Sequence, residues 1–67
     1  DVNAKDNSNS TPLFFAVTFN DIDKVKLLIN NKADINHKND STHTVLSIAN
    51  YFHFTEMINL LKKYGAK

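Results

Sequence analysis

The sequence of 67 residues has no cysteine, no tryptophan and no arginine, and it has a single glycine and a single proline. Without cysteine the chain can form neither a disulfide nor a thiolate metal site, and this absence fits a reducing compartment. With one glycine there is no glycine-rich loop of the kind that holds phosphate groups. Packing alone has to stabilise the chain, although a chain this short buries only a modest share of its surface.

Charge and hydropathy exclude two further classes of protein. All eight positive residues are lysines, and with seven acidic residues the formal net charge is +1. Domains that bind nucleic acid carry clustered positive charge, so we expect no nucleic-acid partner. No apolar run approaches the roughly 20 residues of a membrane-spanning helix, so we also expect no membrane insertion.

What the sequence does contain is a tandem repeat. Asp1-Val2-Asn3 is followed 33 residues later by Asp34-Ile35-Asn36, and at that offset eleven of the 34 pairs that can be compared are identical. Unrelated segments of this composition would share far fewer identical residues. The chain is therefore divided into a first unit, residues 1–33, and a second unit, residues 34–67.

Each unit is predicted to form a polar turn followed by two short helices. In the first unit, Thr11 can cap a helix that Pro12 opens. Asp21 can cap a second helix, whose apolar residues follow helical spacing. In the second unit the corresponding helices are predicted over residues 44–51 and from Thr55 onward. No segment is predicted to form a strand, beyond a short bridge near the turns.

A 33-residue unit of turn, helix and helix, with Thr11-Pro12-Leu13 opening the first helix, resembles the ankyrin repeat. Further slots of that pattern are filled by residues 1–6, Ala16, residues 25–28 and residues 33–36, and in the second unit by Thr44, Leu46, Ala49, Leu60, Leu61, Gly65 and Ala66. The resemblance implies an all-α solenoid of paired antiparallel helices joined by β-turn or hairpin-like loops. Because about three repeats are normally needed for stability, we expect the C-terminal part of a longer array, with neighbouring repeats in the parent chain.

The chain departs from the ankyrin pattern at several slots. Phe14 and Ser47 stand where the family has a histidine that ties neighbouring repeats together by hydrogen bonds, so we expect that link to be lost. Other residues replace the glycine that is usual at turn and helix-end slots; they are Asn9, Asn20, Lys32, Thr42 and His53. Thr42 is β-branched and should tolerate a left-handed backbone worst.

Candidates for catalysis or metal binding are few. His37 and His43 lie six residues apart in one turn region, but a metal site needs further ligands, and we expect these histidines to be solvated. Asp21 and Asp23 sit at a predicted helix start, where the helix dipole explains them better than acid–base chemistry does. No serine, histidine and carboxylate cluster has the spacing of a nucleophile. We therefore expect no enzyme activity, no cofactor and no metal.

The resemblance implies binding of a protein partner of unknown identity, inside the cell and in the cytoplasm. In the ankyrin family, partners are held by the turn tips and by the exposed end of the first helix, on a concave face. Carried over slot by slot, the candidate contact residues are Lys5, Asn7, Ser8, Ser10, Thr18, Phe19, Lys38, Asp40, Ser41, His43, Tyr51 and Phe52. The alternative is a purely structural role, in which the repeats cap a longer array or pack on a neighbouring domain of the same polypeptide.

Two pairs of residues leave alternatives open. Phe19 and Phe52 occupy equivalent positions one repeat apart. They are either exposed anchors for a partner or additional core beneath the neighbouring turn. Asn3 and Asn36 occupy a slot that is sometimes hydroxylated in the ankyrin family, and the structural alternative is that their side chains hold the turn.

Overall fold

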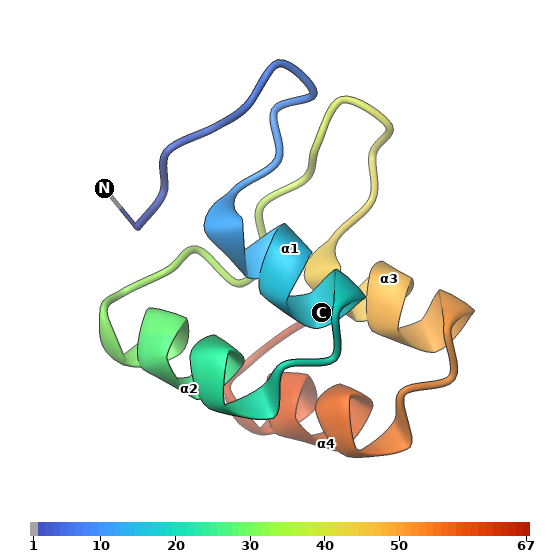
Figure 1. Ribbon diagram of the computed structural model, residues 1–67. Helices are drawn as coiled ribbons and strands as arrows, with labels where there is room; N and C mark the ends of the chain where they lie inside the picture. Colours follow the sequence, from blue (N-terminus) through green and yellow to red (C-terminus); the bar gives the residue numbers. More distant parts are fainter. Residues whose placement is uncertain (1) are drawn as a thin grey trace.

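The computed structural model describes residues 2–67, which contain four helices and no strand. The helices are α1 (Pro12–Thr18), α2 (Ile22–Asn30), α3 (Val45–Tyr51) and α4 (Thr55–Lys63). Each helix of the second unit begins and ends 33 residues after its counterpart in the first. In Figure 1 the two turn regions stand side by side above α1 and α3, and α2 and α4 lie below them. The predicted all-α fold is confirmed.

Local sequence explains where the helices start. The Asp21 carboxylate accepts a hydrogen bond from the Lys24 backbone N–H at 3.2 Å and so caps α2. Thr44 and Ser47 form a reciprocal capping box at the start of α3. Helices of seven or nine residues are unstable alone in water, so these caps locate the helices while tertiary packing holds them.

The packing comes from one apolar cluster that joins the two units. α1 packs on α2, α3 on α4, and α1 on α3. The buried members of the cluster are Leu13, Phe14, Ala16, Val17, Val25, Val45, Leu46, Ala49, Met57 and Leu61. Burying one large aliphatic side chain stabilises a fold by about 1.5–3 kcal/mol, so this shared cluster is the main source of stability.

Asn3 and Asn36 each tie the opening of their unit to the segment that follows its second helix. The Asn3 side chain accepts from the Asp34 backbone N–H at 2.9 Å and donates to the Lys32 carbonyl at 3.4 Å. The Asn36 side chain accepts from the Lys67 N–H at 3.0 Å and donates to the Gly65 carbonyl at 3.3 Å. The structure thus supports the turn-holding role for both amides.

The left-handed backbone positions repeat with the same period. Asn9 and Thr42 have φ of 62° and 61°, and Asn20 and His53 have φ of 54° and 58°. Lys32, at φ 70°, corresponds to Gly65, at φ 98°. Every slot where another residue replaces the family's usual glycine is therefore left-handed, so the topology imposes this conformation even on residues that disfavour it.

Replacing Thr42 with glycine is expected to stabilise the fold by roughly 1 kcal/mol, because glycine adopts φ near +60° without the strain of a β-branched side chain. The change removes an exposed hydrogen bond from the Thr42 hydroxyl to the Ser41 carbonyl, 2.6 Å long, which contributes little in solvent. Urea unfolding monitored by circular dichroism measures the difference. The matched control is Asn9→Gly, which should change stability less because asparagine tolerates this region. A destabilised Thr42→Gly variant would contradict the prediction.

Thr11 lies at the N-cap of α1, as predicted, but its side chain makes no capping hydrogen bond. The residue is 1% exposed, and its hydroxyl has no hydrogen-bond partner among the described residues. In the second unit the equivalent Thr44 hydroxyl accepts from the Ser47 N–H at 3.2 Å. An unsatisfied buried hydroxyl costs roughly 1–3 kcal/mol, so Thr11 is a local defect in the first unit.

Replacing Thr11 with valine is expected to stabilise the chain by about 1 kcal/mol, because a methyl group of similar size takes the place of the unpaired hydroxyl. Replacing Thr44 with valine should have the opposite sign and cost about 1 kcal/mol, because it removes a working cap. Thermal unfolding of the two variants beside the parent chain compares them directly. Destabilisation by both substitutions would show that the Thr11 hydroxyl does have a partner in solution.

Candidate partner-binding surface

The two turn tips are built by the same hydrogen bonds. The Asp6 carboxylate accepts from the backbone N–H groups of Ser8 and Ser10, both at 2.9 Å. The amide oxygen of Asn39, 33 residues later, accepts from the N–H groups of Ser41 and His43, both at 3.0 Å. Such turns, in which an Asp or Asn side chain binds the backbone just beyond it, fix loop conformation. The tips are therefore ordered before any partner arrives.

The tips are also tied to each other. The Asp40 N–H donates to the Ser8 carbonyl at 3.0 Å. The His37 ring nitrogen Nε2 lies 2.9 Å from the Asn9 carbonyl oxygen, so Nε2–H donates to it. The edge of the same ring packs on Phe14, with ring centroids 6.1 Å apart and planes at 82°. His37 thus links the second unit to the first.

This link corrects the expectation that the turn histidines are solvated. His43 and His53 are exposed, but His37 is half-buried. It also replaces, from another position, the inter-repeat histidine link that we expected to be lost, and its ring contacts the very phenylalanine that displaced the usual histidine. Sequence reasoning missed His37 because a single histidine in a polar turn gives no sign of its partner 28 residues away.

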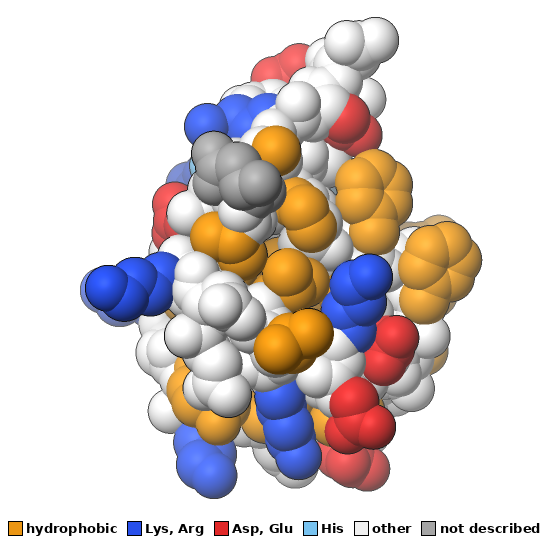
Figure 2. Space-filling model, turned by 60° about the vertical axis from the view of Figure 1, so that its left-hand side comes forward, with side chains coloured by type: hydrophobic (Ala, Val, Ile, Leu, Met, Phe, Trp, Pro, Cys, Tyr) orange, Lys and Arg blue, Asp and Glu red, His pale blue; other side chains and the backbone are white. Residues whose placement is uncertain are grey.

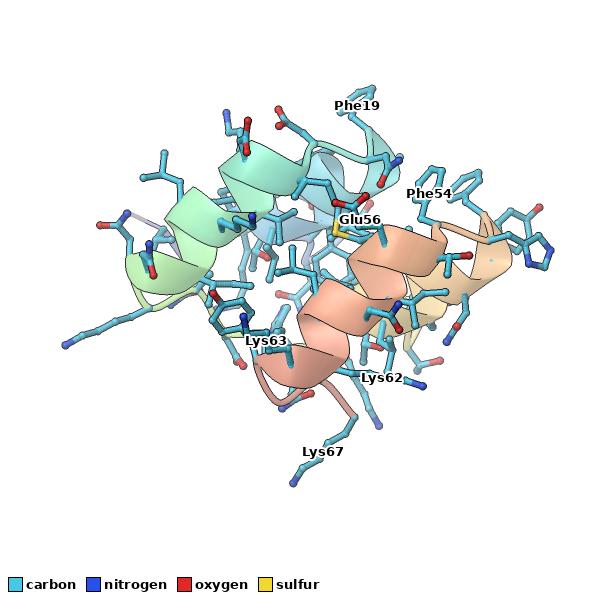
Figure 3. The ribbon with its side chains drawn as sticks, turned by 90° about the horizontal axis from the view of Figure 1, so that it is seen from below. Phe19, Phe54, Glu56, Lys62, Lys63 and Lys67 are labelled. Carbon is cyan, nitrogen blue, oxygen red and sulfur yellow. The ribbon has the colours of Figure 1, made fainter. Side chains whose placement is uncertain are left out.

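The aromatic residues lie where α1 and α3 end. Phe19 and Phe52 are the residues just beyond α1 and α3, and they are 78% and 45% exposed. In Figure 3 the Phe19 ring points away from the helices at the corner between α1 and α2. Tyr51, also 78% exposed, meets the Phe52 ring edge-on with centroids 5.0 Å apart, and Phe54 stacks on the other side at 5.3 Å. Neither Phe19 nor Phe52 belongs to the buried core.

A hollow beside α3 adds depth to this aromatic group. It is lined by His43, Ser47, Ile48, Tyr51 and Phe52. The hollow therefore runs from the second turn tip to the aromatic end of α3. Its apolar wall and polar rim resemble the arrangement expected of a recognition surface.

Of the twelve predicted contact residues, eleven are exposed and Ser10 is half-buried. The Thr18 hydroxyl is engaged with the Phe14 carbonyl at 2.8 Å. Within residues 2–67 no cluster of three histidine, cysteine or carboxylate side chains could hold a metal ion. No helix in the same range is long and apolar enough to cross a bilayer. The accessible surface offers contacts to a partner and no constellation of catalytic groups among the described residues.

The comparisons with known proteins agree with this architecture. A family model described as "Ankyrin repeats (3 copies)" matches residues 1–67. The chain is also similar to an ankyrin repeat protein of fowlpox virus (strain NVSL), with 44% identity over 48 residues. The matched segment covers 72% of this chain but only 9% of the viral protein, so the similarity concerns the repeats alone.

Proposed function

Because the chain belongs to the ankyrin repeat family, we propose that it is a non-enzymatic module that binds a protein partner inside the cell. Ankyrin repeats are generally protein-interaction modules. The binding surface comprises the turn tips and the exposed ends of α1 and α3, with Phe19 and Phe52 as its anchors. No cofactor takes part.

The observation that carries the proposal is the exposure of Phe19 and Phe52 at equivalent positions beside ordered turns. Large apolar rings in water are unfavourable, and burying one against a partner recovers about 25 cal/mol for each Å² removed from solvent. Because the turn tips are already fixed by hydrogen bonds, little further ordering has to be compensated on binding. Aromatic side chains at the centre of an interface, surrounded by small polar residues, commonly dominate its energetics.

The purely structural role is the second candidate, and it is favoured by a different observation. Phe15 and Leu27, on other parts of the first unit, are also 50% and 59% exposed. Apolar residues there would suit packing on a neighbouring part of the parent polypeptide. The two candidates therefore predict different contact residues.

Mapping a bound partner by NMR separates the two candidates. Binders are first selected from a displayed library of natural protein fragments, and each is titrated into the isotopically labelled chain. Our proposal predicts amide shifts at residues 5–10, at residues 38–43 and around Phe19, Tyr51 and Phe52. Shifts confined to α2, or to the exposed apolar residues Phe15 and Leu27, would refute it and support the structural role.

A further inference from the structure

The two units bury opposite sides. Lys24 is exposed, whereas its counterpart Met57 is 0% exposed; Leu28 is half-buried, whereas Leu61 is 0% exposed. The second unit has the first packed against it through α1 and α3, and among the described residues the first unit has no such neighbour. These positions therefore mark the side on which a unit receives the unit before it. We call it the receiving side.

On the first unit the receiving side is an open, largely apolar hollow. It is lined by Pro12, Phe15, Ala16, Phe19, Asp21 and Lys24. The corresponding residues of the second unit are Val45, Ile48, Ala49, Phe52, Phe54 and Met57, of which Val45, Ala49 and Met57 belong to the buried cluster. Figure 2 shows apolar side chains gathered on this side of the molecule, between lysines and acidic residues. What fills the second unit's receiving side is the first unit.

The other side of each unit shows the reverse trend. Three apolar residues of the first unit, Phe14, Val17 and Val25, are 3%, 0% and 0% exposed. Their counterparts in the second unit are Ser47, Asn50 and Ile58, and Lys62 stands where the first unit has Ile29. Lys62 and Lys67 project outward at the end of α4 in Figure 3. The second unit therefore presents a largely polar side, as the terminal repeat of a stack requires.

From this asymmetry we propose that the receiving side of the first unit docks another turn–helix–helix repeat, one that presents apolar side chains like Phe14, Val17 and Val25. A second copy of this chain fits poorly, because head-to-tail packing would bring Ser47, Asn50 and Lys62 against the apolar hollow. Docking also leaves the partner-binding surface usable. Phe52 already has a preceding unit in place and is still 45% exposed, so Phe19 remains accessible to a partner.

Two fusions of equal composition test the proposal. In the first, a copy of residues 1–33 is placed directly before Asp1, so that its apolar side faces the hollow. In the second, the same copy follows Ala66 in place of Lys67, so that it meets the polar side of the second unit. Thermal melting should give one cooperative transition for the first fusion, at a midpoint about 10 °C or more above that of the chain alone. The second fusion should gain little.

A substitution within the hollow provides an independent readout. Lys24→Met places the buried residue of the second unit at the equivalent position of the first. It should raise the melting midpoint of the first fusion by several degrees more than that of the unfused chain, because only the fusion buries the new side chain. Equal stabilisation by the two fusions would overturn the proposal. Sedimentation of the unfused chain as a stable dimer that Phe15→Asp dissociates would also overturn it, by assigning the hollow to a second copy.

Discussion

Replacing Phe14 with alanine is expected to leave the chain largely unfolded at 37 °C. The ring is 3% exposed, lies in the shared cluster and meets the His37 ring of the second unit. Truncating a buried phenylalanine to alanine costs about 3–5 kcal/mol. A domain of 67 residues has only roughly 3–10 kcal/mol of stability in total. One substitution therefore removes a third or more of the stability, and loosens the only interface between the described units.

The adjacent Phe15 supplies a matched control for this prediction. It lies in the same helix, loses the same atoms in Phe15→Ala, and is 50% exposed. We expect Phe15→Ala to cost less than about 1 kcal/mol, since little apolar surface leaves a buried environment and alanine favours helix. Helix content by circular dichroism at 37 °C and urea midpoints measure both variants. Similar midpoints for the two variants would mean that burial of Phe14 contributes far less than the structure indicates.

The helices and the strained turns could be predicted from the sequence because both depend on local information. The 33-residue period transfers each boundary from one unit to the other, so one recognised cap locates two helices. The left-handed slots at Asn9 and Thr42 followed from the same period, since a turn of fixed geometry needs the same backbone conformation in each copy. The residue types at these slots were poor guides by themselves, because threonine and lysine disfavour the conformation that they adopt.

Features that depend on contacts across the chain could not be predicted in this way. The hydrogen bond from His37 to the Asn9 carbonyl joins residues in different units, and nothing in either local segment specifies it. The unpaired hydroxyl of Thr11 is another case. Its counterpart Thr44 has the same residue type and the same N-cap position, and only Thr44 makes the capping bond to Ser47. The two sites differ in the third residue of the helix, where phenylalanine replaces serine.

The exposure of Phe19 and Phe52 also required the structure. Their equivalent positions showed that the two rings share one role, but the pattern was equally consistent with anchor and core. The difference in exposure, 78% against 45%, arises from surroundings that the repeat does not share. Phe52 has Tyr51 and Phe54 against its ring, whereas the corresponding positions beside Phe19 are Thr18 and Asp21. Identical residues in identical slots can therefore face different amounts of solvent.

Simultaneous replacement of Phe19 and Phe52 by serine is expected to weaken binding of a partner selected on this surface by about 100-fold or more. Anchor residues at the centre of an interface each contribute at least about 2 kcal/mol on truncation, and 1.4 kcal/mol corresponds to a tenfold change in affinity. Stability should fall far less. Phe19 is 78% exposed, and loss of the Phe52 contacts with Tyr51 and Phe54 should cost only about 1 kcal/mol.

Leu27→Ser is the matched control for this double variant, because Leu27 is a large apolar residue that is 59% exposed and lies in α2, outside the predicted contact set. Isothermal titration of the same partner into the parent chain, the double variant and the control compares the three affinities, while circular dichroism records their melting midpoints. Binding should be lost in the double variant and kept in Leu27→Ser, with all three chains folded. If the double variant binds normally, the rings are not anchors. If it melts as low as Phe14→Ala, the rings stabilise the fold in solution and the lost binding reports unfolding.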